Sequence, residues 1–218
     1  MKYKAFLLVL MLANMLGNFA TAEEITVNYK SFYSHIRKLN NDDLNALQFA
    51  FGFQHIREPR LCKVSSAKIS TEKQQIPLVV TDEGRFTVPS EKALNLAKAK
   101  VVISLKEQAN LCDMSVQLET KPEYLKTTYQ QSELQHIYNQ YDAFFDKMGS
   151  FLSFLMPSVI GISLHVENVS EEELHFLGLG EQVKFDGKKI EFTKDALSNM
   201  SEITLPEKPL RITALTDK

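Results

Sequence analysis

The amino-acid sequence predicts an α+β fold in which two or three helices pack on a mainly antiparallel sheet. Successive segments with strand periodicity are joined by local turn signals, which favours antiparallel pairing over the βαβ alternation of parallel sheets. Two longer segments, residues 28–39 and 132–148, place apolar residues at helical spacing instead. Two cysteines, Cys62 and Cys112, are available for one disulfide.

The first 22 residues have the three parts of a secretory signal peptide. Lys2 and Lys4 precede an apolar stretch from Ala5 to Leu16, and Ala20-Thr21-Ala22 supplies the small-residue end. An apolar stretch of about 12 residues is too short to span roughly 30 Å of hydrocarbon. We therefore expect cleavage after Ala22, which leaves residues 23–218 as one exported domain, either periplasmic or secreted.

The charge balance argues against a nucleic-acid partner. The chain carries 25 Lys and Arg against 27 Asp and Glu, a formal net charge of −2. Loss of Lys2 and Lys4 with the leader would make the mature protein more acidic by two charges. Binding to phosphates needs clustered basic residues, and no basic stripe is present in the sequence.

The two cysteines both belong to the expected mature chain, where an oxidising compartment favours a disulfide. A bond between Cys62 and Cys112 would close a loop of about 50 residues and stabilise the fold by roughly 4 kcal/mol in the chain-entropy model. The alternative is a redox or metal site. Such sites favour close spacing of the C-x-x-C type, which this sequence lacks.

The first half of the chain predicts several strands and two short helices. Asn28 and Ser90 are candidate caps for helices that run to Leu39 and Lys100. Expected strands are 47–54, 64–69, 76–80, 85–88, 101–105 and 112–119. In the strand 47–54, the small residues Ala50 and Gly52 on the second face indicate that this face is covered or closely approached. In the strand 112–119 we expect a dry face with Cys112, Met114, Val116 and Leu118, and a wet face with Asp113, Ser115, Gln117 and Glu119.

The second half contains the longest helical signal, residues 132–148. Capping boxes are expected at Thr120–Glu123 and at Ser132–Gln135. The apolar stripe of this helix is Leu134, Ile137, Tyr141, Phe144, Phe145 and Met148, which should lie on the sheet. Phe185-Asp186-Gly187-Lys188 predicts a type I′ hairpin, in whose register Val183 faces Ile190 and Lys184 faces Lys189. A last strand is expected at Leu210, Ile212 and Ala214.

Residues 148–166 contain no Asp, Glu, Lys or Arg, so a membrane span must be considered. Pro157 and Gly161 interrupt the run and argue against a span in the mature chain. We expect a helix end, a turn through 149–157, and a buried core strand at 160–166. The aromatic and aliphatic residues of the turn cannot all point inward, so an interaction surface is expected at Phe151, Phe154 and Leu155.

Signatures of catalysis are missing from the sequence. It has no G-x-S-x-G nucleophile elbow, no H-E-x-x-H metal motif and no phosphate loop. His165, Glu167 and His175 are weak candidates for a metal site, since no ligand spacing rule supports them, and solvated or hydrogen-bonded side chains explain them as well. We therefore assign no catalytic residue, no metal and no cofactor.

Several segments resemble a family of exported gammaproteobacterial proteins known as domain of unknown function 2987 (DUF2987). The resembling segments are SFYSHIRKL, LQFAFGF, GRFTVPSEKALNLAKAKV, CDMSVQLETKPEYL and FFDKMGSFLSFLMPSV. They extend over nearly all of the expected mature chain. The resemblance implies a protein of the Gram-negative envelope, and it implies no activity, so no functional residue can be transferred.

The sequence thus predicts a non-catalytic binding or interaction module of the cell envelope, with an envelope protein or an apolar ligand as its partner. The alternatives are a peripheral lipid-handling protein, and a hydrolase whose site is assembled from residues distant in sequence. A broad apolar cavity would favour the lipid role. A deep polar pocket with converging histidines and carboxylates would favour the hydrolase, and a flat aromatic patch would favour a protein partner.

Overall fold

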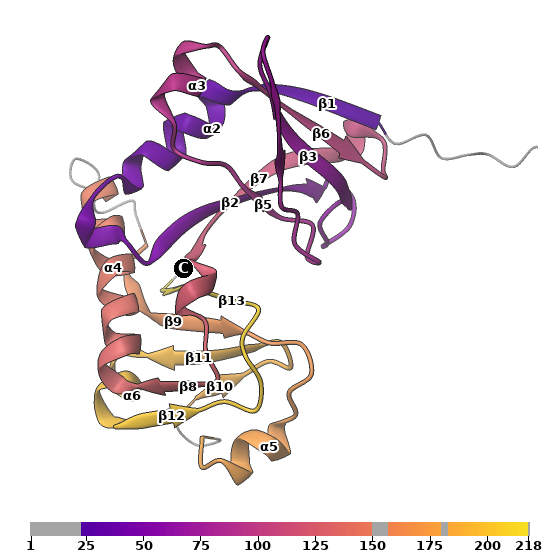
Figure 1. The fold of residues 1–218 in the computed structure, drawn as a ribbon. Helices are drawn as coiled ribbons and strands as arrows, with labels where there is room; N and C mark the ends of the chain where they lie inside the picture. Colours follow the sequence, from indigo (N-terminus) through magenta and orange to yellow (C-terminus); the bar gives the residue numbers. More distant parts are fainter. Residues whose placement is uncertain (1–22, 150–156, 180–182, 218) are drawn as a thin grey trace, which may run out of the picture.

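The computed structural model describes residues 23–149, 157–179 and 183–217, and within them every strand pair is antiparallel. This confirms the predicted α+β class. Figure 1 shows an N-terminal sheet with α2 and α3 at one end of the molecule, a C-terminal sheet with α4 and α6 at the other, and β2 and β7 between them.

The strands form four sheets. The N-terminal sheet has the order β1 (Glu23–Asn28), β6 (Lys100–Leu105), β3 (Val64–Ser70), β4 (Gln75–Leu78). The middle sheet is β5 (Phe86–Thr87), β2 (Leu47–His55), β7 (Cys112–Thr120), and the C-terminal sheet is β10 (Lys184–Phe185), β11 (Lys189–Thr193), β9 (Val159–His165), β13 (Arg211–Thr216). A two-stranded sheet joins β12 (Glu202–Thr204) to β8 (Thr128–Gln130).

The helices are α2 (Tyr29–Ile36), α3 (Lys92–Leu96), α4 (Gln131–Gly149), α5 (Glu171–Phe176) and α6 (Lys194–Asn199). Short 3₁₀ turns lie at Arg37–Leu39, Asp42–Leu44, Ala109–Leu111 and Pro122–Tyr124. Among the described residues, no helix combines the length and apolarity needed to cross a membrane.

Helix α2 forms because Tyr29, Phe32 and Ile36 recur at helical spacing, and all three are buried. The ring of Phe32 packs edge-on against Phe51 of β2, with 4.8 Å between the ring centres. The predicted amphipathic helix is confirmed, and this contact places its apolar face on β2.

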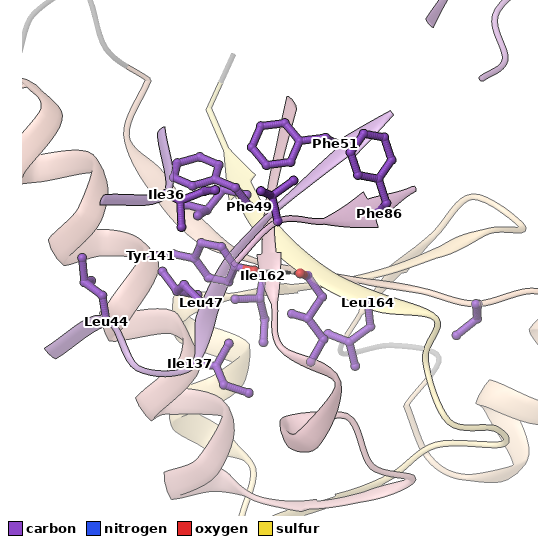
Figure 2. Packing of buried hydrophobic residues seen from close by; sticks show 14 of the residues in the cluster. Ile36, Leu44, Leu47, Phe49, Phe51, Phe86, Ile137, Tyr141, Ile162 and Leu164 are labelled. Atoms are coloured by element: carbon purple, nitrogen blue, oxygen red, sulfur yellow. Dashed lines mark hydrogen bonds between the residues drawn. The ribbon is translucent and has the colours of Figure 1, made fainter. Parts of the chain in front are cut away.

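Helix α4 confirms the longest helical prediction, and Leu134, Ile137 and Tyr141 are almost fully buried along it. The Tyr141 hydroxyl donates to the carbonyl oxygen of Ile212 at 2.7 Å, which joins the helix to the C-terminal sheet (Figure 2). Phe144 and Phe145 are only partly buried. Met148 is 42% exposed, so the predicted stripe leaves the core in its last turn.

Both predicted capping boxes are wrong. Helix α4 begins at Gln131, and the carboxylate of Glu133 accepts a hydrogen bond from the backbone of Gln130 at 3.0 Å instead. The Thr120 hydroxyl lies 3.1 Å from that of Tyr141, so it is used in the core and caps no helix. Ser90 also caps no helix: α3 ends at Leu96 and does not reach Lys100, because Lys98 adopts a positive φ of 51° and the chain turns into β6.

Strand β9 is the predicted core strand, and it pairs with β11 on one side and β13 on the other. Ile162 and Leu164 are fully buried in it, below β2 in Figure 2. A Cβ atom at Gly161 would collide with the carbonyl oxygen of Phe192, which explains glycine in this position. Ile160, predicted to be in the core, is 40% exposed.

The hairpin register differs from the prediction. Lys184 pairs with Glu191, and Phe185 with Ile190, so Lys184 and Lys189 do not face each other. The side chain of Asp186 accepts hydrogen bonds from the backbone nitrogens of Lys188 and Lys189, at 3.0 and 2.8 Å. This local preference of aspartate moves the loop one residue along the chain.

Candidate functional site

The floor of the candidate site is the second face of β2, which carries Gln48, Ala50, Gly52 and Gln54. Small side chains there allow close approach: a Cβ atom at Gly52 would lie 3.3 Å from the carbonyl oxygen of Gly84 and 3.6 Å from Cγ of Arg85. The sequence predicted that this face is covered or closely approached, and the approaching groups are the carbonyl oxygen of Gly84 and the side chain of Arg85.

A tight turn at residues 81–84 presents Arg85. The Thr81 backbone nitrogen donates to the Arg85 carbonyl oxygen at 2.7 Å, and Gly84 donates to the Thr81 carbonyl oxygen at 2.9 Å. Gly84 has a positive φ of 74°, a conformation that glycine adopts without strain. A Cβ atom there would also lie 3.1 Å from the carbonyl oxygen of Cys62, so the turn packs against the disulfide.

Arg85 is the most unusual residue of the site. Its side chain lines two cavities, yet the residue is only 8% exposed. Its Nε and Nη1 atoms are buried, and no described residue accepts a hydrogen bond from either. Burial lowers the pKa of Arg85, and the nearby charge of Glu119 opposes that effect. Burial of a cation without hydrogen-bond acceptors costs free energy. An acceptor from outside the described chain would therefore stabilise Arg85 in this position.

Arg211 and His165 face each other as Cα partners in the β13–β9 pair. Nη2 of Arg211 lies 3.0 Å from Nδ1 of His165, and Nε2 of His165 lies 3.0 Å from the Thr213 hydroxyl. Because guanidinium only donates, Nδ1 accepts and the proton of His165 is on Nε2. Burial, with help from the charges of Lys189 and Arg85, lowers the pKa of His165 to about 4, so the ring is neutral.

Arg211 also bonds to the other half of the molecule. Its Nη1 donates to the carboxylate of Glu83 in the 81–84 turn. Its Nε is buried without an acceptor among the described residues, as in Arg85, and burial lowers its pKa. Both arginines thus carry unused donors, and both line the same cavity.

This larger cavity, which we call the cationic cleft, has a volume of about 870 Å³. Its basic residues are Arg60, Lys63, Arg85, Lys106 and Arg211, and its acidic residues are Asp82 and Glu83. The surplus of positive charge is notable in a chain whose net charge is −2. Arg60 is already paired with Glu58 and Glu107, whereas Lys63 and Lys106 have no ion-pair partner among the described residues.

A second cavity of about 300 Å³ shares Thr81, Asp82, Glu83 and Arg85 with the cationic cleft. It is lined by Glu119 and Gln48, whose amide donates to Glu119 Oε1 at 3.0 Å, and by apolar side chains that include Val79, Phe86, Leu125 and Leu210. Glu119 is only 8% exposed, although the strand pattern predicted it on the wet face, and Met114 from the predicted dry face is 42% exposed. Burial raises the pKa of Glu119.

The predicted disulfide is confirmed: Cys62 and Cys112 are joined, with 6.2 Å between their Cα atoms. Within the described part of the chain, the one group of three or more candidate metal ligands is Cys62, Glu107 and Cys112, and its two sulfurs are committed to the disulfide. The structure does not bring His165, Glu167 and His175 together in such a group. The predicted interaction surface at Phe151, Phe154 and Leu155 lies outside the described residues.

Sequence reasoning missed Arg85, Glu119 and Arg211. Arg85 and Glu119 were noted only as members of predicted strands. The signal that could have found the site is the pair Ala50 and Gly52, because small residues on one face of a strand mark the place where another group approaches.

These features define a disulfide-linked α+β protein with a basic cleft between its two end sheets. The model of the family described as protein of unknown function (DUF2987) matches residues 21–166, and the chain belongs to this family. No curated protein and no solved structure matches it.

Proposed function

We propose that this protein is an exported, non-catalytic binding module of the cell envelope, and that its cationic cleft binds an anionic group of the ligand. The observation that carries the proposal is Arg85, which lines the cleft with two buried nitrogens that lack acceptors in the described chain. Carboxylate and phosphate oxygens are strong acceptors for guanidinium, and the geometry of these contacts is well matched.

The surroundings of Arg85 support the same ligand class. Arg211 adds a further buried donor that has no acceptor among the described residues, and Lys63 and Lys106 extend the positive field along the cleft. A cavity of about 870 Å³ lies within the range of roughly 300–1,000 Å³ that is usual for small-molecule sites. A charged lining of this kind favours a charged ligand over a lipid tail.

The state of His165 supports binding rather than hydrolysis. Both ring nitrogens are engaged, one by Arg211 and the other by Thr213. The ring therefore has no free nitrogen to act as a general base on a ligand in the cleft. Its role in the proposal is to hold the guanidinium of Arg211 in position.

Export is supported by two observations. The first 22 residues have the composition of a signal peptide, and the part of the chain that follows them contains a disulfide. The family match begins at residue 21, close to the proposed cleavage after Ala22.

The test is calorimetric titration of the mature protein with sodium malonate and with inorganic phosphate at constant ionic strength. Hydrogen bonds to charged groups contribute about 1.5–3 kcal/mol, so Arg85→Gln should weaken anion binding roughly 10- to 100-fold. Arg37→Gln is the matched control, because Arg37 is exposed and does not line the cleft. The proposal fails if the wild-type protein binds neither anion, or if Arg85→Gln binds both as tightly as Arg37→Gln.

Native mass spectrometry of protein purified from its own envelope would complement the titration, because it preserves a ligand that remains bound during purification. We expect a retained acidic molecule on the wild-type protein, and no such molecule on Arg85→Gln.

A further inference from the structure

Two opposite charges lie buried in the second cavity without pairing. Arg85 and Glu119 both line it, and each is only 8% exposed. They are close enough for the charge of each to shift the pKa of the other. The two side chains nevertheless form no direct ion pair.

Each of the two groups has unused hydrogen-bonding capacity. Arg85 keeps Nε and Nη1 without acceptors among the described residues. The carboxylate of Glu119 receives one hydrogen bond from the described chain, from the Gln48 amide at 3.0 Å, whereas an ionised carboxylate can accept about four. A ligand group that carries both a negative and a positive charge would supply the hydrogen-bond partners that this buried cation and this buried anion lack among the described residues.

The charge of the second cavity differs from that of the cationic cleft. Its acidic residues are Asp82, Glu83 and Glu119, and Arg85 is the one basic residue in its lining. Glu83 is bonded to Arg211, but Glu119 and Asp82 form no ion pair with a described residue. The cavity can therefore hold a positive group beside the anion that Arg85 binds.

Beyond the charged residues, the second cavity is lined by Gln48, by three threonines and by apolar residues, and two of the apolar residues are exposed to solvent. Val79 is 84% exposed and Leu210 is 44% exposed, and both line the cavity together with Phe86 and Leu125. Exposed aliphatic side chains at the mouth of a pocket are favourable contacts for an apolar ligand group. With a volume of about 300 Å³, the cavity fits a small molecule.

We propose that the second cavity binds a small zwitterion with an apolar substituent, that is, an α-amino acid with an apolar side chain. Its carboxylate lies on Arg85, its ammonium group lies on Glu119, and its side chain lies on Val79 and Leu210. This inference rests on the proposed function, since it assigns the anionic group bound by Arg85 to a carboxylate, and it adds the positive and apolar parts of the same ligand.

The experiment compares L-leucine and L-phenylalanine with their N-acetyl derivatives by calorimetric titration of the mature protein. Acetylation removes the ammonium charge and keeps the carboxylate and the side chain. We expect each free amino acid to bind at least tenfold more tightly than its N-acetyl derivative. Glu119→Gln should abolish this preference, whereas Arg37→Gln should retain it, and thermal unfolding of both variants confirms that they fold.

The outcomes separate the two proposals. If the N-acetyl derivatives or malonate bind through Arg85 but the free amino acids have no advantage, the cleft binds anions and the zwitterion inference is wrong. If the amino acids bind but Glu119→Gln keeps their advantage, the ammonium group is not on Glu119 and the inference also fails. If no anion binds at all, both proposals fail.

Discussion

The carboxylate of Glu83 accepts a hydrogen bond from Nη1 of Arg211, although the two residues are 128 positions apart in the chain. Glu83 belongs to the turn that presents Arg85, and Arg211 begins the last strand of the C-terminal sheet. The pair therefore connects the turn between β4 and β5 to the C-terminal sheet at the cationic cleft. It also fixes the position of the turn relative to His165, the second partner of Arg211.

A double-mutant cycle should measure this connection. The side chains of Glu83 and Arg211 are 29% and 16% exposed, so solvent screens their interaction only in part. We expect a coupling energy of about 1–2 kcal/mol between Glu83→Gln and Arg211→Gln in urea unfolding of a protein that comprises residues 23–218. If the two single changes add without coupling, the bond contributes nothing to stability.

The neutral state of His165 predicts a pH dependence of stability. Its pKa is about 4 in the folded protein and 6.5 as the ordinary value, so the unfolded chain binds this proton more readily. Stability is fully present above pH 6.5 and decreases as the pH falls from there toward 4. The loss reaches roughly 3 kcal/mol at most, because one pKa unit corresponds to about 1.4 kcal/mol.

Urea unfolding of residues 23–218 at a series of pH values checks this prediction. His165→Gln should remove most of the slope between pH 6.5 and 4. His175→Gln is the control, because His175 is exposed, and it should leave the slope unchanged. Equal slopes in wild type and His165→Gln would show that other groups cause the pH dependence.

Local periodicity was sufficient to predict most of the elements. The spacing of Phe32 and Ile36 specifies α2, and the alternation in 47–54 specifies β2, because burial of one face of a helix or strand needs a fixed period. Strand β1 was not predicted. Its residues 23–28 alternate in burial only weakly, and their pairing with β6 depends on residues far away in the sequence.

The candidate site was not predictable because it depends on contacts between distant segments. Glu119 alternates correctly with the wet residues of its strand, but the cavity that it lines is also lined by residues of the 81–85 turn and by Leu210. Alternation reports which residues share a face. It does not tell which face another part of the chain will cover.

The disulfide should make a large contribution to stability. Its loop spans 50 positions, for which the chain-entropy model gives about 4 kcal/mol. We expect the double variant Cys62→Ser, Cys112→Ser to unfold at a lower urea concentration than wild type by a corresponding amount. Addition of a reductant should have the same effect on wild type and none on the variant. Free thiols in protein that was expressed in an oxidising compartment would contradict the assignment.

The strand β9 allows a paired test of the core. Ile162 is fully buried between β11 and β13, whereas Ile160 in the same strand is 40% exposed. Ile162→Asp places an unpaired charge in the core, which costs more than a domain of marginal stability can tolerate, so this variant should not fold. Ile160→Asp changes the same residue type in the same strand and should lower the free energy of unfolding by no more than about 1 kcal/mol. Circular dichroism and urea unfolding of the two variants distinguish them, and similar behaviour of both would show that β9 is not oriented with Ile162 inward.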